Sequence, residues 1–290
     1  MAARAWRPLG IALAWIALYA LVGGGVGVGL TKIYAVVANH YLLVLPDATS
    51  PWFLPVFATL LVVGFVTATW LVGVRLAKHS ASQLGWRGHV VRSLVRGCAI
   101  GVLAAAVAMA LAIVPGGARV WIAPDWPAYL RATAPIALGL LAAALIEELA
   151  FRGFPLRRLA DALGAWPATL LLAVAFAAAH LLNPNASAFG TLNVALAGIW
   201  LSIAFFSPGG IALGWGAHFG WNFGLALLNA PVSGMRLGPT QAVYHPGAHA
   251  WFDGGAFGPE GGLVGTIAIA TGVAAILGSR VRRPREWVAA

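Results

Sequence analysis

The most restrictive feature of this chain is a succession of long apolar stretches with very few charged residues inside them. An α-helix rises about 1.5 Å per residue, so about 20 apolar residues cross the ~30 Å hydrocarbon core of a bilayer. Charged residues make up 9% of the chain, whereas soluble domains carry about 25%. We therefore expect an all-α, polytopic membrane protein with a single transmembrane domain over residues 1–290.

The apolar stretches that are long enough to span a bilayer number about eight. We place them at residues 9–37, 52–77, 93–114, 133–159, 166–182, 188–206, 210–229 and 262–280. The fifth to seventh stretches are short and are separated by turns with Pro184 and Pro208, so a bundle of seven spans also stays open. Residues 231–262 are rich in Gly and Pro, and we expect an external cap or a re-entrant segment there.

The formal net charge of +10 is better explained by membrane orientation than by nucleic acid binding. The basic residues lie at the ends of apolar stretches and form no single patch. Cytoplasmic segments carry an excess of Lys and Arg. If both termini are cytoplasmic, most basic residues, including the cluster at 280–285, lie on that side, and the other side receives Lys32, Arg119, Arg131 and Arg236. We therefore expect a cell-membrane protein with both termini in the cytoplasm.

Three ionisable residues, Glu147, Glu148 and Arg152, interrupt the fourth apolar stretch. A charged side chain at mid-bilayer costs at least ~3 kcal/mol, so such residues usually face a bundle interior and mark function. On a helix Glu148 and Arg152 share a face and can pair, whereas Glu147 projects about 100° away and stays available. A purely structural ion pair is the alternative interpretation.

Three further polar residues follow on later apolar stretches: His180 on the fifth, and His218 and Asn222 on one face of the seventh. Counted at about 1.5 Å per residue from the expected cytoplasmic helix ends, these residues and Glu147 lie about 12–21 Å deep. Residues that only pack between helices would have no reason to lie at the same depth in the membrane. The pattern therefore predicts one buried polar site.

The residue types in this site suit hydrolysis. We expect Glu147 and His180 to orient and deprotonate a water that attacks a peptide carbonyl. His218 and Asn222 would donate hydrogen bonds to the developing oxyanion, an effect worth about 3–4 kcal/mol per well-placed donor. The ion pair beside Glu147 would hold the geometry.

Three motifs in order also carry a family resemblance. Glu-Glu-x-x-x-Arg on one span, Phe-x-x-x-His at Phe176 and His180 on the next, and His-x-x-x-Asn two spans later resemble the motifs of the CPBP family. That family groups type II CAAX prenyl endopeptidases with bacteriocin-processing and immunity proteins, also called Abi proteins. The resemblance covers residues 133–229, the expected catalytic core helices.

The resemblance implies an eight-helix intramembrane endopeptidase with a glutamate-activated water. It assigns the activating role to Glu147 and His180 and the oxyanion role to His218 and Asn222. The implied partners are the lipid bilayer and a peptide or protein substrate at the membrane, with or without a lipid anchor.

Alternative functions use the same residues. In the preferred interpretation no cofactor is required, whereas a metal-dependent version would hold zinc through Glu147, His180 and His218. A non-catalytic immunity or peptide-binding protein would keep the polar cluster without turnover. A transporter would use the buried Glu and His as a proton relay, although no repeated pair of broken helices is evident in the two halves.

Overall fold

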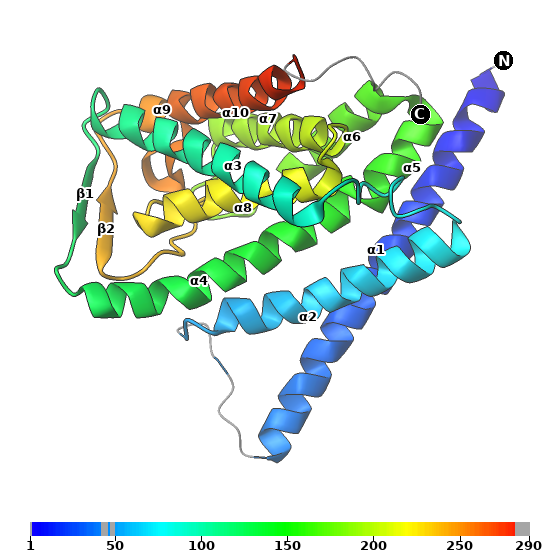
Figure 1. The fold of residues 1–290 in the computed structure, drawn as a ribbon, viewed down its shortest axis with the longest axis horizontal. Coiled ribbons are helices and arrows are strands. Elements are labelled where there is room, and N and C mark those ends of the chain that lie inside the picture. The colour runs from blue at the N-terminus through cyan, green and yellow to red at the C-terminus, as the bar shows by residue number, and fades with distance from the viewer. Residues whose placement is uncertain (1, 42–45, 47–49, 282–290) are drawn as a thin grey trace.

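The computed structural model describes residues 2–41, 46 and 50–281. The described chain is mostly helical, as expected, with two short strands in addition (Figure 1). The basic cluster used above to orient the chain lies largely outside the described residues, from 282 onward. The fold thus confirms an all-α polytopic membrane protein, and the orientation in the membrane stays a prediction.

The helices follow the predicted apolar stretches closely. They are α1 (Ala2–His40), α2 (Phe53–Ala68) with its π-helical continuation η1 (Thr69–Leu76), α3 (Val90–Ile113), α4 (Trp126–Glu147), the π-helical turn η2 (Glu148–Arg152), α5 (Phe154–Leu163), α6 (Ala165–Ala179), α7 (Ala188–Phe205), α8 (Gly210–Leu227) and α10 (Leu263–Val281).

Five helical segments of the described chain are long and apolar enough to cross a membrane. They are Pro8–His40, Phe53–Leu76, Val90–Ile113, Trp126–Leu163 and Ala188–Phe205. Two shorter apolar helices, Ala165–Ala179 and Leu263–Gly278, accompany them. α8 belongs to neither group, because His218 and Asn222 lower its mean hydropathy. A count of eight spans therefore remains a prediction for α6, α8 and α10.

The predicted span 133–159 differs from the structure because the α-helix stops at Glu147. The chain then makes one π-helical turn, in which the Gly153 N–H donates to the Glu148 carbonyl at 2.9 Å. Gly153 leaves the helical region with ψ −112°, and Pro155 in the first turn of α5 lacks an N–H for the continuing ladder. Single π turns recur at functional sites.

The predicted span 166–182 also ends early. α6 stops at Ala179, and His180 occupies its C-cap position. The next helix, α7, begins at Ala188. The Ser187 hydroxyl accepts a hydrogen bond from the Gly190 N–H at 3.0 Å and caps the start of α7. His180 is therefore presented by a helix end.

The segment between α8 and α10 is folded. It contains the strand β2 (Ala242–His245), the short helix α9 (Ala250–Asp253) and the 3₁₀ turns η3 (Gly255–Phe257) and η4 (Pro259–Gly261). β2 pairs antiparallel with β1 (Arg119–Ile122) of the α3–α4 connection, with Arg119 opposite His245. The two connections therefore lie at one end of the bundle.

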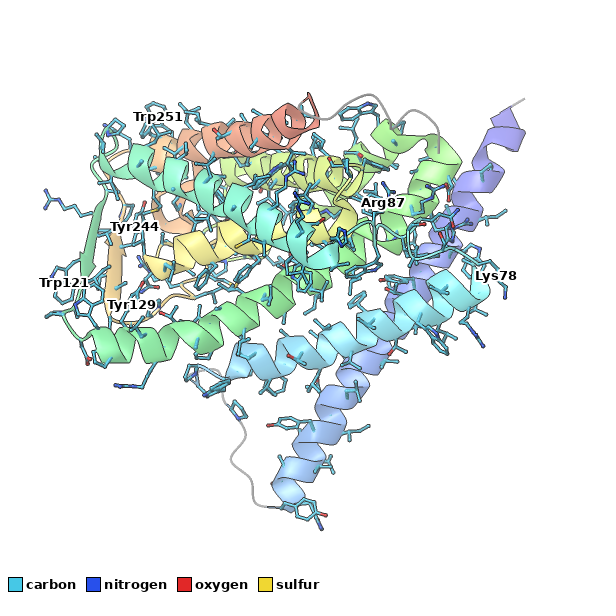
Figure 2. The ribbon with its side chains drawn as sticks, in the orientation of Figure 1. Lys78, Arg87, Trp121, Tyr129, Tyr244 and Trp251 are labelled. Atoms are coloured by element: carbon cyan, nitrogen blue, oxygen red, sulfur yellow. The ribbon has the colours of Figure 1, made fainter. Side chains whose placement is uncertain are left out.

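That end of the bundle carries a group of aromatic residues. Figure 2 shows Trp121, Tyr129, Tyr244 and Trp251 at the end where β1 pairs with β2, with Lys78 and Arg87 at the opposite end. Trp121 and Trp251 are exposed, as expected for side chains at a membrane interface.

Burial and the charge of Asp253 raise the pKa of the Tyr244 hydroxyl, which therefore stays protonated.

Glycines allow α3 and α8 to pack backbone against backbone. A Cβ at Gly220 would overlap the carbonyl oxygen of Cys98, and one at Gly216 would overlap that of Leu94. On the facing helix, a Cβ at Gly101 would overlap the carbonyl of Ala217. Close approach of this kind is typical of small residues at helix interfaces in membranes. It fixes α8, the helix that carries His218 and Asn222.

Candidate active site

The π-helical turn after α4 buries an ion pair. Arg152 Nη1 donates to Glu148 Oε1 at 3.2 Å, and the side chains of Glu148 and Arg152 are 0% and 1% exposed. The Arg152 guanidinium also lies 4.0 Å from the ring centroid of Phe176 on α6, a cation–π contact. The expected pair is therefore present and is held from two helices.

His218 on α8 lies between the two glutamates. Its Nδ1 lies 2.9 Å from Glu148 Oε1, and its Nε2 lies 3.6 Å from Glu147 Oε2. Because Glu148 faces Arg152 as a carboxylate, the hydrogen of this short contact belongs to His218 Nδ1. The ring is thus oriented from behind by Glu148 and presents Nε2 to Glu147.

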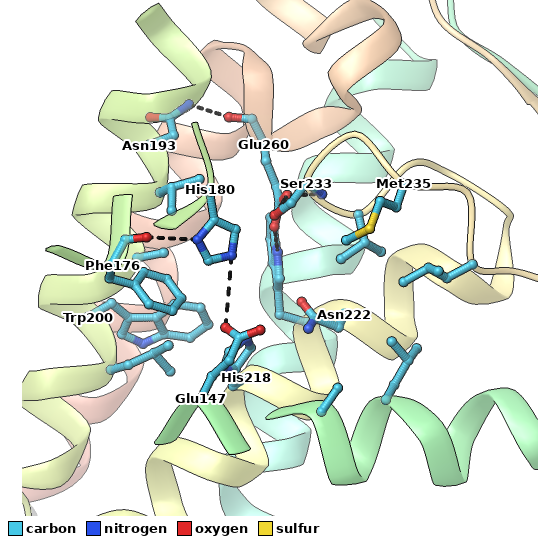
Figure 3. Close-up of a pocket in the computed structure, with 18 of the residues that line it drawn as sticks. Glu147, Phe176, His180, Asn193, Trp200, His218, Asn222, Ser233, Met235 and Glu260 are labelled. Atoms are coloured by element: carbon cyan, nitrogen blue, oxygen red, sulfur yellow. Dashed lines mark hydrogen bonds and ion pairs between the residues drawn. The ribbon is translucent and has the colours of Figure 1, made fainter. Parts of the chain in front are cut away.

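His180 presents its ring in the same way from the end of α6. Its Nδ1 donates to the Phe176 carbonyl at 2.8 Å, since a carbonyl only accepts. Its Nε2 lies 3.9 Å from Glu147 Oε2 (Figure 3). Two imidazole Nε2 atoms therefore face one carboxylate oxygen, at separations that exceed a direct hydrogen bond.

These side chains line a cavity of about 150 Å³. Glu147, His180, His218 and Asn222 all border it (Figure 3). The Glu147 side chain is 32% exposed, whereas Glu148 and its arginine lie behind the wall. A water takes about 30 Å³ in the liquid, so the cavity has room for several waters or one side chain.

The cavity is also lined by residues that were not predicted from the sequence. Ser233 and Glu260 come from the segment after α8, and Asn193 comes from α7. The Asn193 amide donates to the carbonyls of Glu260 and Gly262 at 2.8 and 2.9 Å. The signal for Glu260 was present, because it is an acidic residue directly before the last apolar stretch of a chain with 8 acidic residues.

A metal centre is the alternative use of Glu147, His180 and His218. Among the residues that the structure describes, no three or more His, Cys, Asp or Glu side chains are grouped so that they could hold a metal ion. Glu147, His180 and His218 face each other, and the metal-dependent use of these residues stays a prediction.

Comparison with known proteins identifies the helices that build this site. Residues 129–224 match a family model described as type II CAAX prenyl endopeptidase Rce1-like. No curated protein and no solved structure matches significantly. The matched segment contains all the motif residues discussed above and supports CAAX-type intramembrane protease activity in general. Residues 129–224, about a third of the chain, are therefore similar to type II CAAX prenyl endopeptidases, which supports membership of the CPBP family.

Proposed function

We propose that this protein hydrolyses a peptide bond of a membrane-associated peptide or protein, with a water activated by Glu147 and His180 as the nucleophile. One observation carries the proposal: the Nε2 atoms of His180 and His218 lie 3.9 and 3.6 Å from the same oxygen, Glu147 Oε2. That oxygen accepts no hydrogen bond from the described residues. A water bridging these groups would be oriented and polarised at once.

The different Nδ1 partners of the two histidines support different roles. His180 Nδ1 donates to the Phe176 carbonyl, so the neutral ring carries its lone pair on Nε2. His218 Nδ1 faces the Glu148 carboxylate, and in the proposed mechanism this ring also carries a hydrogen on Nε2. His180 therefore suits a base beside Glu147, and His218 suits a hydrogen-bond donor.

The proposed reaction has two steps. Glu147, assisted by His180, removes a proton from the water as the oxygen attacks the carbonyl carbon, and the carbonyl π electrons move to oxygen. His218 Nε2–H and the Asn222 amide donate to this oxyanion. The intermediate then re-forms the carbonyl as the C–N bond breaks, and the proton held by Glu147 goes to the leaving amine.

The buried pair behind the site has a positioning role in this scheme. Glu148 accepts from both Arg152 and His218, so one carboxylate sets the ring orientation of the proposed oxyanion donor. Arg152 in turn is held against Phe176, whose carbonyl orients His180. The two imidazoles are thus linked through neighbouring groups of one network.

The proposal includes the location of the protein and the class of its substrate. We propose a multi-pass protein of the cell membrane with cytoplasmic termini, because most basic residues then face the cytoplasm. The substrate would be a peptide or protein at the membrane, and the family description suggests a prenylated C-terminus as a first candidate.

Comparative proteomics of membrane-associated peptides tests this function directly. Cells expressing the wild-type chain are compared with cells expressing Glu147→Gln at equal membrane levels. We expect peptides whose intact forms accumulate only with Glu147→Gln. Identical peptide profiles in the two strains, together with an unaltered fold of the variant, would indicate a non-catalytic membrane protein.

A further inference from the structure

A second carboxylate, Glu260, lines the same cavity as Glu147. It lies in η4, directly before α10 and outside the segment that matches the family. Figure 3 shows its side chain reaching Ser233 within the pocket. Neither the proposed water activation nor the oxyanion contacts use it.

The Glu260 carboxylate accepts three hydrogen bonds from Trp221 and Ser233. Trp221 Nε1–H donates to Oε1 at 2.6 Å, and the Ser233 hydroxyl donates to Oε2 at 2.8 Å. The Ser233 backbone N–H also donates to Oε2. The N–H groups of Trp221 and Ser233 can only donate, so both oxygens of Glu260 act as acceptors.

No cation balances this charge among the described residues. None of their ion pairs includes Glu260. The two histidines that border the cavity face other carboxylates: His180 faces Glu147, and His218 faces Glu147 and Glu148. Much of the remaining wall is apolar, including Trp200, Val232 and Ile269. An anion in such surroundings attracts a cation more strongly than one in water.

The size of the cavity limits what the carboxylate can receive. A volume of about 150 Å³ corresponds to about five waters at ~30 Å³ each. This space suits one side chain of a peptide and not a folded partner. A long apolar stem with a cationic head fits both the apolar wall and the carboxylate.

From this geometry we propose that Glu260 is a specificity-determining residue that receives a cationic side chain, lysine or arginine, close to the scissile bond. This inference rests on the proposed function, since it names part of the substrate of the Glu147 site. A purely structural role would be different: Glu260 would then tie Ser233 and Trp221 together without regard to the charge of the substrate.

Peptide binding to a chain that cannot turn over tests this inference. The full chain with Glu147→Gln is placed in lipid nanodiscs and titrated with fluorescent, lipid-anchored peptides. Each peptide is made with lysine or with acetyl-lysine at one position at a time. We expect lysine to bind about tenfold more tightly than acetyl-lysine at one position, and Glu260→Gln to remove this difference.

Two matched variants separate charge from packing. Ser233→Gly removes one donor to Glu260 but keeps the carboxylate, and glycine suits the positive φ of 47° at this residue. Glu260→Asp keeps the charge. Both should keep the lysine preference. A Glu260→Gln variant that weakens lysine and acetyl-lysine peptides equally would show a structural role and overturn the proposal.

The comparison without any substitution at Glu260 is decisive on its own. If the Glu147→Gln chain binds lysine and acetyl-lysine peptides alike at every position, the specificity role is wrong, whether or not the Glu260 variants fold. The two proposals also fail separately. A wild-type chain that shows the lysine preference but cleaves no peptide keeps the subsite and loses the protease. A wild-type chain that cleaves peptides but shows no lysine preference keeps the protease function and loses the proposed subsite.

Discussion

The α3–α8 pair and the α1–α2 pair use the same packing device with different results. In both, a glycine on one helix faces the backbone of the other: Gly220 faces Cys98 on α3, and Gly64 on α2 faces Gly23 on α1. A Cβ at either glycine would overlap a carbonyl oxygen. Figure 1 shows α8 among the packed helices, whereas α1 and α2 form an arm at the side of the bundle.

The side chains on the other faces of these helices differ. α8 presents His218 and Asn222 to the cavity, whereas α1 presents exposed apolar residues such as Leu21 and Ile33. Backbone packing therefore has a second consequence on α8, because any shift of the helix moves the polar site. α1 and α2 carry none of the proposed reacting groups, and they reach the site through Tyr19, whose hydroxyl donates to the Leu149 carbonyl at 3.1 Å, and through Leu54, which lines the cavity.

The largest effect is expected on the polar side of the comparison. Glu147→Gln should lower the cleavage rate by about 10³-fold or more, because the proposed base is removed while its volume is kept. The measurement is cleavage of a membrane peptide identified by the proteomic comparison, at matched enzyme levels. Thermal stability should change little, since Glu147 Oε2 accepts no hydrogen bond from the described residues.

On α1, replacement of a polar side chain should hardly change the cleavage rate. The Thr31 hydroxyl donates to the Gly27 carbonyl at 3.0 Å, and Thr31 is not among the residues that line the cavity. Thr31→Ala is the control for Glu147→Gln and should keep the cleavage rate. A similar loss in both variants would mean that the assay reports folding and not chemistry.

A smaller loss is expected at the proposed oxyanion donor. Asn222→Ala should lower kcat by about 10²-fold with little change in KM, because the amide acts only as negative charge develops. Steady-state kinetics on the same peptide provide the test. A raised KM with unchanged kcat would instead assign Asn222 to substrate binding.

The two glycine interfaces give the most direct comparison. Gly220→Ala and Gly64→Ala should each lower the free energy of unfolding by about 1–3 kcal/mol, because a methyl group is forced against backbone. Only Gly220→Ala should also lower kcat, by about tenfold, since displacement of the site is costly. Thermal unfolding and kinetics are measured on the same purified samples. Equal kcat losses in the two variants would contradict the difference between the interfaces.

Metal removal is also expected to have little effect on cleavage. Dialysis against a chelator should leave kcat within about twofold, because the proposed nucleophile is activated by protein groups alone. Metal analysis of the purified protein accompanies the assay. Loss of activity that zinc restores would favour the metal-dependent scheme, in which Glu147, His180 and His218 become ligands.

Local chemistry made much of this protein predictable. Long apolar stretches predict membrane helices because the hydrocarbon core allows few alternatives, and their positions agree with the helices to within a few residues at most ends. The pairing of Glu148 with Arg152 was also predictable, because it depends only on helical spacing. His180 and His218 were suggested by the high cost of polar groups in apolar surroundings.

Other features were decided by contacts between distant segments. The sequence predicted neither the contact of His218 with Glu148 nor that of Arg152 with Phe176, since each joins separate helices. The π-helical turn at Glu148 and the position of His180 at a helix end also escaped the periodicity. Such breaks depend on how neighbouring helices satisfy the backbone.

The sequence by itself determined that this chain is a membrane protein, and it predicted polar residues at one depth, because transfer of charge into hydrocarbon is costly wherever it occurs. Only the tertiary structure decided which atoms face each other. It joined strands of four residues that are too short to show a period, and it brought Glu260 to the cavity that Glu147, His180 and His218 border. Both results depend on long-range packing, which no local pattern encodes.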